Sequence, residues 1–233
     1  MRTNDPNIAK VELVARALGD LCDDFVFVGG CAAGLLITDN AAPPVRVTYD
    51  VDLLVQVASR IEYRRAEKQL AGRGFKRDLK KDAPICRWTY NELEVDLMPI
   101  DPTILGFSNR WYAHASATAT RLTLPSGRAI KLISAASFVA TKFEAFNDRG
   151  KSDPLGSHDL EDILNVLEGR PGIVDEISKE DATLRAYLST AFHALTQLPN
   201  FSDYLPGLLS QDELLNERVA IVRARIDTIV GLT

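Results

Sequence analysis

The stretch Thr48-Tyr49-Asp50-Val51-Asp52-Leu53-Leu54-Val55 places two carboxylates at the entrance to an apolar segment. Side chains alternate along a strand, so Asp50 and Asp52 project from one face while the intervening apolar residues pack the other way. Two carboxylates held so close repel each other unless a cation lies between them, and a hard divalent cation with oxygen ligands fits that position. We therefore interpret Val45–Val57 as a strand that enters the core and carries a candidate metal site.

A third carboxylate lies in Leu93-Glu94-Val95-Asp96-Leu97-Met98, a second predicted strand. Glu94 and Asp96 share a face of it, and either could reach the same ions. An isolated Asp-x-Asp is more often a solvated strand edge. Acids set among core-forming residues are costly without a partner, however, which favours a metal centre. We expect Asp50, Asp52 and Asp96 to hold Mg²⁺, or Mn²⁺ in its place, as catalytic ligands.

Upstream, the apolar run Phe25–Val28 ends in Gly29-Gly30, followed by Cys31. This pattern predicts a buried strand, a tight turn and a short helix over Cys31–Ile37. No side chain obstructs the turn, so backbone N–H groups at the helix start can cradle phosphates. Gly-Gly alone usually marks only a turn, and it gains meaning here from the carboxylates that follow.

The remaining pattern predicts a mixed α/β half over residues 1–133 and a helical half over residues 134–233. In the first half we expect helices Ile8–Leu21 and Arg60–Gly72 and hairpins turning at Asn91-Glu92 and Pro125-Ser126-Gly127. In the second half we expect helices Ala135–Asn147, Ser157–Leu167, Ile173–Ser178, Leu184–Leu195 and Gln211–Val230. Ser157 is a candidate N-cap for its helix.

Charge is distributed unevenly along the 233 residues, whose formal net charge is −5. Residues 1–150 hold 20 basic and 18 acidic residues, a sum of +2, whereas residues 151–233 hold 7 and 14, a sum of −7. Residues 60–81 contain nine basic residues and only three acidic ones. An anionic partner is thus expected to meet the first half of the chain, although residues 60–81 could equally be a solvated face.

Several classes of protein are disfavoured by the same sequence. No apolar run approaches the roughly 20 residues of a membrane-spanning helix, so no membrane partner is expected. Residues 1–6 lack an apolar signal core, and Cys22, Cys31 and Cys86 form no disulfide or zinc pattern. We expect a cytoplasmic protein with reduced thiols.

The helical half carries its own set of charges. Lys142 and Arg149 are seven residues apart and share a helix face, and Asp159 and Asp162 share a face of the next predicted helix. These four residues could contact a ligand or could form interhelical salt bridges that tie two helices together.

Gly29-Gly30 followed by Asp50-Val51-Asp52 and Asp96 resembles the signature of the DNA polymerase β superfamily of nucleotidyltransferases. Arg46-Val47-Thr48-Tyr49-Asp50-Val51-Asp52-Leu53 is similar to the AbiEii-type nucleotidyltransferase toxins of toxin–antitoxin systems. The segment from Ala140 to Ile163, with Lys142, Arg149 and Asp159, is similar to a later motif of that branch. The resemblance covers roughly residues 24–168, and Cys31 departs from it because many members have Ser or Thr there.

This resemblance implies a polymerase β-type mixed sheet followed by a helical domain, and transfer of a nucleoside monophosphate from a nucleoside triphosphate to a hydroxyl. The implied acceptor is RNA, in particular a tRNA 3′ end, and a cognate antitoxin is an implied partner. Lys142 would contact the phosphates, and Asp159 would orient Lys142 or take part in proton transfer. The implied nucleotide-binding set is Gly29, Gly30, Cys31, Arg46, Thr48, Lys142 and Arg149. An aminoglycoside-type small-molecule acceptor and a non-catalytic nucleotide-binding module are the alternatives.

Overall fold

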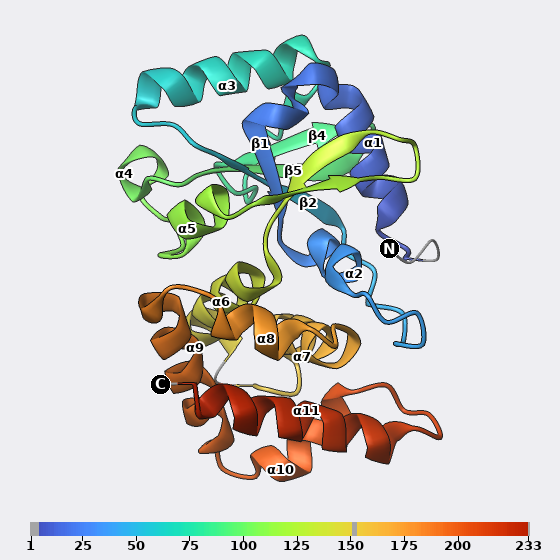
Figure 1. The fold of residues 1–233 in the computed structure, drawn as a ribbon. Coiled ribbons are helices and arrows are strands. Elements are labelled where there is room, and N and C mark those ends of the chain that lie inside the picture. Colours follow the sequence, from blue (N-terminus) through green and yellow to red (C-terminus); the bar gives the residue numbers. More distant parts are fainter. Residues whose placement is uncertain (1–4, 151–152, 233) are drawn as a thin grey trace. The chain divides into compact units, whose positions relative to one another are not determined.

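The computed structural model describes residues 5–150 and 153–232, and it confirms a mixed α/β fold (Figure 1). The described residues divide into two compact units. One, here called the sheet unit, comprises residues up to Leu35 together with Arg46–Ser134; the other, the helical unit, comprises Leu36–Val45 and the chain from Ala135 onward.

The sheet unit is built around seven strands in the order β3-β4-β5-β2-β1-β7-β6. The strands are β1 (Phe25–Val28), β2 (Asp50–Val55), β3 (Lys76–Arg77), β4 (Arg87–Tyr90), β5 (Leu93–Pro99), β6 (Thr120–Thr123) and β7 (Ala129–Leu132). Its helices are α1 (Ile8–Leu18), α3 (Arg60–Gly72), α4 (Pro102–Leu105) and α5 (Tyr112–Ala117), with 3₁₀ turns at Gly19–Asp24 and Gly30–Ala32. The short α2 (Ala33–Leu36) follows the second of these turns and leads out of the unit.

The centre of the sheet is mixed. β2 pairs in parallel with β5 and antiparallel with β1, and β1 pairs in parallel with β7. β4 and β5 form the predicted hairpin, whose turn residues Asn91 and Glu92 both have positive φ (46° and 66°). A two-residue turn of this kind matches the twist of the strands and fixes their register.

One face of the sheet is covered by α3. Its buried residues are Tyr63, Ala66 and Leu70, and the Tyr63 hydroxyl donates to the Leu97 carbonyl at 2.8 Å. Glu67 of the same helix pairs with Arg77 of β3. Arg77 lies opposite Trp88 in the strand register, so α3 covers the face on which Trp88 projects.

The predicted strand Val45–Val57 is too long at both ends, because β2 begins at Asp50 and ends at Val55. The polypeptide before Asp50 is bound by Asn7, whose Nδ2 donates to the Arg46 carbonyl at 3.0 Å and whose Oδ1 accepts from the Thr48 N–H at 2.9 Å. These backbone groups are therefore satisfied by a side chain and not by a neighbouring strand. Of the alternating residues Val45, Val47 and Tyr49, only Val45 is buried, and sheet pairing begins at Asp50.

The helical unit consists of α6 (Ala135–Ala145), α7 (His158–Gly169), α8 (Ile173–Ser178), α9 (Ala182–Thr196), α10 (Phe201–Tyr204) and α11 (Leu215–Val230). A π-helical turn, Phe146–Gly150, follows α6, and a 3₁₀ turn, Leu205–Leu208, follows α10. Helix α6 is buried over nearly its whole length, and its Phe143 meets Phe192 of α9 edge-on at 4.7 Å between centroids. The predicted N-cap is confirmed, because the Ser157 hydroxyl accepts from the Leu160 N–H.

Residues 36–45 pack with the helical unit, although the sequence pattern placed them in the first half. The N–H groups of Thr38 and Asp39 both donate to the Gly169 carbonyl at 3.0 Å, and the Arg170 guanidinium donates to the Leu36 carbonyl at 2.6 Å. Gly169 also lies so close to Ile37 that a Cβ atom there would fall 2.7 Å from it. Contacts between segments so far apart along the chain leave no periodic signal in either segment.

Candidate active site

The sheet register brings the three acids predicted as metal ligands onto one face. β2 and β5 run in parallel, with Asp52 beside Asp96 and Asp50 beside Glu94. Registered neighbours on adjacent strands project to the same side of a sheet. Ligand oxygens of Asp50, Asp52 and Asp96 all lie within 4.8 Å of one another, and Asp96 is only 7% exposed. These three carboxylates could hold a divalent cation, which takes oxygen ligands of this kind.

Gly29 is required by its closeness to this cluster. Its φ is +70°, a conformation that side chains disfavour. A Cβ atom on Gly29 would fall 1.7 Å from Asp52 Oδ2, far inside van der Waals contact. The glycine thus lets the end of β1 approach Asp52, and this role explains the first half of the Gly-Gly pair without a phosphate.

A cation from the chain itself lies among these acids. Arg87 of β4 is directly opposite Asp96 of β5, and its Nε and Nη2 donate to Asp96 Oδ1 and Oδ2 at 2.9 and 2.8 Å. Its Nη1 donates to Glu94 Oε2, and Nη2 reaches Asp50 Oδ2 at 3.5 Å. A two-pronged contact between guanidinium and carboxylate is among the stronger polar interactions in proteins.

Electrostatics reflect this crowding of charge. The hydrogen bond from Arg87 to Asp96 raises the pKa of the Arg87 guanidinium above its ordinary value, against the opposing effect of burial, and the charges of Asp96, Glu94 and Asp50 act in the same direction. One guanidinium is thus shared among three carboxylates, Asp96, Glu94 and Asp50. A bound divalent cation would supply further positive charge at this face.

The segment before Asp50 is bound by Asn7, which precedes α1, and by Lys10 of α1. Asn7 is fully buried, and its Oδ1 accepts from both the N–H and the hydroxyl of Thr48. The Thr48 hydroxyl also lies 3.3 Å from the Asp50 carbonyl, and Lys10 Nζ donates to the Thr48 carbonyl. Thr48, predicted to bind nucleotide, therefore has a positioning role in this structure. Arg46 precedes it in the same segment with a half-buried side chain.

Cys31 and Gly30 form the turn after β1. Cys31 is fully buried, and its thiol donates to the Val28 carbonyl at 3.2 Å. Gly30 begins a 3₁₀ turn in which the Ala32 N–H donates to the Gly29 carbonyl. The α-helix begins only at Ala33. The thiol is thus turned toward the backbone, and any phosphate contact at this turn would fall to backbone N–H groups, as the sequence led us to expect.

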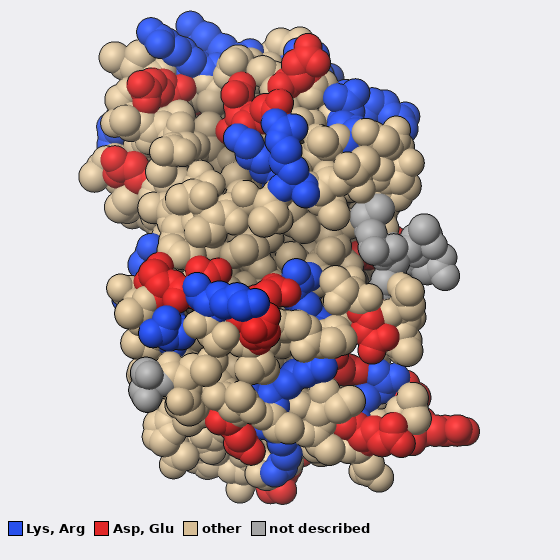
Figure 2. Space-filling model, viewed as in Figure 1, with Lys and Arg blue, Asp and Glu red and all other residues tan. Residues whose placement is uncertain are grey.

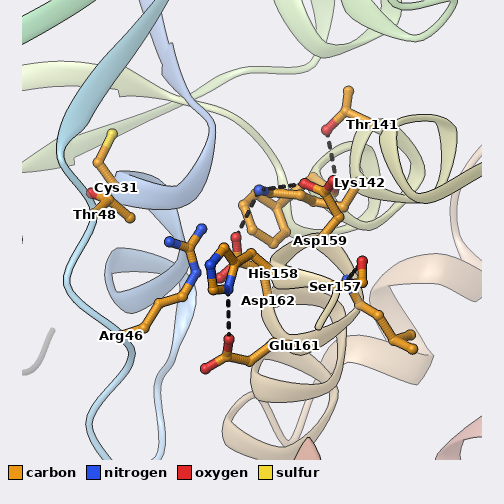
Figure 3. A network of polar contacts seen from close by, with 12 residues as sticks. Cys31, Arg46, Thr48, Thr141, Lys142, Ser157, His158, Asp159, Glu161 and Asp162 are labelled. Atoms are coloured by element: carbon orange, nitrogen blue, oxygen red, sulfur yellow. Dashed lines mark hydrogen bonds and ion pairs between the residues drawn. The ribbon is translucent and has the colours of Figure 1, made fainter. Parts of the chain in front are cut away.

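Of the charged residues predicted in the helical half, Lys142, Asp159 and Asp162 lie close together (Figure 3). Lys142 Nζ of α6 lies 3.1 Å from Asp159 Oδ1 and 2.7 Å from Asp162 Oδ2, both on α7. Arg149 completes the network with contacts of 2.8 and 3.1 Å to the two oxygens of Asp159. The interhelical salt bridges that the sequence left open are therefore present.

The charges of this network shift the ionisation of Lys142 and Asp159 against the effect of burial. Burial alone would lower the pKa of Lys142, but Asp162 and Asp159 outweigh it, and the pKa is raised. Burial would raise the pKa of Asp159, but the hydrogen bond from Arg149 and the charge of Lys142 outweigh it, and the pKa is lowered. Both charged forms are therefore favoured in the folded state, and the network ties α6 to α7.

Arg87 and Asn7 are the two residues that the sequence analysis missed. A signal for Arg87 was present, because a two-residue turn at Asn91-Glu92 pairs residue 90 with 93 and hence Arg87 with Asp96. No comparable signal exists for Asn7, which contacts a segment about forty residues away.

The donor set fits a magnesium ion. Three carboxylates within reach of one another supply the hard oxygen ligands that Mg²⁺ prefers, and the remaining positions suit water and substrate phosphate. Each oxygen of Asp96 accepts one hydrogen bond from Arg87 and keeps a further lone pair for a metal.

No family model matches the sequence, and no curated protein is significantly similar to it. None of the described helices is long and apolar enough to cross a membrane.

Proposed function

We propose that this protein is a Mg²⁺-dependent nucleotidyltransferase that transfers a nucleoside monophosphate from a nucleoside triphosphate to a hydroxyl group. The observation that carries the proposal is the convergence of Asp50, Asp52 and Asp96, whose ligand oxygens lie within 4.8 Å of one another on one sheet face. The resemblance of the surrounding motifs to polymerase β-type nucleotidyltransferases supports the same reaction. The three carboxylates are its catalytic and metal-binding residues.

The protein's own groups have distinct tasks in this proposal. Asp50, Asp52 and Asp96 would hold the metal ions, and the pairing of the neighbouring strands β2 and β5 sets the spacing of the three carboxylates. Gly29 leaves room for Asp52, and the hydrogen bonds of Asn7 to Thr48 fix the start of β2. When bound, Mg²⁺ would activate the attacking hydroxyl and stabilise the charge of the leaving pyrophosphate.

Residues of the helical unit enter the proposal through the resemblance. By that argument Lys142 and Arg149 contribute to triphosphate binding, and Asp159 orients Lys142 or takes part in proton transfer. The network observed in the helical unit supports the orienting role, since Asp159 accepts from both Lys142 and Arg149. A Lys142 ammonium that contacted phosphate would need to give up part of its pairing with Asp159 and Asp162.

We propose RNA, in particular a tRNA 3′ end, as the acceptor. Basic side chains gather over α3 (Figure 2), but α3 covers the sheet face opposite the carboxylates. The later part of the basic segment is better placed. Lys76 lies opposite Thr89, which lies opposite Glu94, so Lys76 projects on the face of the cluster.

Lys76 and Lys80 line a hollow of about 600 Å³ together with Thr89, Asn91 and Glu94. Lysine ammonium groups at the rim of such a hollow can contact successive phosphates of an RNA strand. The alternative is a solvated surface hollow that does not contact RNA. Replacement of both lysines by Glu distinguishes the two, because only contact with RNA predicts weaker RNA binding with a reduced salt dependence.

A small cationic acceptor such as an aminoglycoside is the second candidate, and the charge of −7 over residues 151–233 favours it. The deciding experiment incubates the protein with Mg²⁺, each α-labelled nucleoside triphosphate and total tRNA. Label in RNA supports the proposal. Label only in an added aminoglycoside replaces the acceptor, and absence of label with metal-independent nucleotide binding indicates a non-catalytic module. The cognate antitoxin that the resemblance implies would be tested by co-expression with the product of a neighbouring gene, which should suppress any toxicity of this chain.

A further inference from the structure

We infer that Arg87 is an internal counter-ion that competes with the metal for Asp96 and Asp50 and thereby sets the metal affinity of the carboxylate cluster. The inference rests on the proposed function, which places Mg²⁺ at Asp50, Asp52 and Asp96. It adds a positioning residue that the sequence motifs do not contain.

The Arg87 guanidinium lies against two of the three carboxylates of the cluster. Arg87, Asp96 and Asp52 occupy one row across the adjacent strands β4, β5 and β2. The side chain of Arg87 is 17% exposed, and it donates to both oxygens of Asp96 at 2.9 and 2.8 Å. Its positive charge thus lies beside the position that three carboxylates would give to a metal ion.

The carboxylate oxygens that contact Arg87 are also those expected to bind the metal ion. Asp96 presents both of its oxygens to Arg87, and Asp50 Oδ2 lies 3.5 Å from Nη2. A metal ion drawn toward Asp50, Asp52 and Asp96 must share those oxygens with the guanidinium and approach its charge. Like charges a few ångströms apart in a partly buried site repel strongly, so Arg87 weakens metal binding.

Glu94 gives the Arg87 guanidinium an alternative partner. Glu94 accepts from Nη1 of Arg87, and it lies two residues from Asp96 on the same strand and the same face. The guanidinium can therefore keep one carboxylate while it releases Asp50 and shares Asp96. Without metal, Arg87 offsets the repulsion among the acids; with metal, the ion takes over that role.

A matched control is available on the neighbouring strand. Arg77 of β3 also pairs with a carboxylate, Glu67, but it lies opposite Trp88 and so projects from the other face of the sheet. Arg77→Met and Arg87→Met remove the same charge from the same sheet. Only the second change removes it from the carboxylate cluster.

The experiment measures Mg²⁺ binding to the full chain by calorimetry and thermal melting at increasing Mg²⁺, with no nucleotide present. Arg87→Met should bind Mg²⁺ at least about tenfold more tightly than wild type. Its melting temperature should be lower without Mg²⁺ and should recover with it. Arg77→Met should keep the wild-type affinity, and any loss of its melting temperature should be independent of Mg²⁺.

Unchanged or weaker Mg²⁺ binding by Arg87→Met would overturn the inference and leave the proposed function intact, provided that wild type binds the ion. If neither protein bound Mg²⁺, and Asp52→Asn changed nothing, both proposals would be wrong. If Arg87→Met did not fold, Arg87→Gln would replace it, because Gln removes the charge but keeps a side-chain N–H that can donate to a carboxylate. Its affinity should exceed that of wild type, and an affinity at or below wild type would overturn the inference.

Discussion

Arg87 and Asp96 lie directly opposite each other on β4 and β5, and the guanidinium donates to both carboxylate oxygens. The two-pronged ion pair of this sheet face thus involves one of the three residues proposed to hold metal. Stability without metal and affinity for metal are therefore opposed at this site. Removal of a carboxylate should relieve repulsion while it abolishes function.

Asp52→Asn should separate these two effects. We expect nucleotidyl transfer to fall by at least about a hundredfold, because a metal ligand is lost. We expect the melting temperature without Mg²⁺ to stay equal or rise, because one like charge leaves the cluster. Asp82→Asn is the control, since Asp82 is exposed and outside the cluster. A large loss of stability in Asp52→Asn would show that the carboxylate has a structural role instead.

Gly29→Ala should disrupt the site through geometry alone. The new Cβ would fall 1.7 Å from Asp52 Oδ2, and the φ of +70° adds strain. We expect a loss of more than about 3 kcal/mol in the free energy of unfolding, together with weakened Mg²⁺ binding.

Gly127→Ala is the matched control, because Gly127 has a φ of +82° but a Cβ atom added to it would meet no heavy atom within 4 Å. It should cost only about 1 kcal/mol in chemical denaturation. Equal losses for the two variants would mean that backbone strain, and not the approach to Asp52, determines the need for glycine at position 29.

Lys142→Met should destabilise the helical unit strongly. Lys142 is 8% exposed and pairs with both Asp159 and Asp162, so its removal leaves two buried carboxylates with less compensation. A loss of about 3–5 kcal/mol is expected for such a change. Lys179→Met removes an exposed pair with Asp175 and should cost less than about 1 kcal/mol. Similar small losses in both variants, measured by urea denaturation, would contradict the structural importance of the buried network.

At acid pH, protonation of Asp159 should reduce the stabilisation that the Lys142–Arg149–Asp159 network gives to the folded state. The folded state lowers the pKa of Asp159 from its ordinary 3.8, so its contribution is complete above that value. Stability should fall as the pH drops below 3.8 toward the lower folded-state pKa, because the unfolded chain takes up the proton first. Asp159→Asn should flatten the pH dependence of the unfolding free energy in that window, and an unchanged slope would contradict the assignment.

At alkaline pH the contribution of Lys142 to stability is lost as the pH rises, the reverse of the pH dependence of Asp159. The folded state raises the pKa of Lys142 from its ordinary 10.5, so its contribution is complete below that value and is lost as the pH rises through the folded-state pKa. Wild type should therefore lose stability above pH 10.5 more steeply than Lys142→Met. The comparison requires denaturation curves on both sides of that pH, and parallel curves for the two proteins would contradict it.

Local patterns in the sequence predicted much of the fold. The apolar run Phe25–Val28, the amphipathic helix Arg60–Gly72 and the helix Ile173–Ser178 have the predicted bounds. Each has a clear apolar pattern with a start and an end signal, so short-range physics determines it. The alternation around Asp50 and Asp96 also indicated which carboxylates share a face.

Contacts between distant segments were not predictable in the same way. The Asn7 side chain holds residues 46–48, and the backbone of residues 38 and 39 is held by Gly169. Helices of one turn, such as Pro102–Leu105, are too short to show a period. Arg87 lies between these cases, because the hairpin register gives its position while its role depends on three acids from two other strands.

The most direct test of the central claim measures pyrophosphate release from each nucleoside triphosphate in the presence of total tRNA. Wild type, Asp50→Asn, Asp52→Asn and Asp82→Asn would be compared with Mg²⁺ and with a chelator. The account predicts Mg²⁺-dependent release by wild type and Asp82→Asn, and release at least about a hundredfold slower from the two cluster variants. Release that persists at the wild-type rate in Asp50→Asn or Asp52→Asn, or in the chelator, would contradict it.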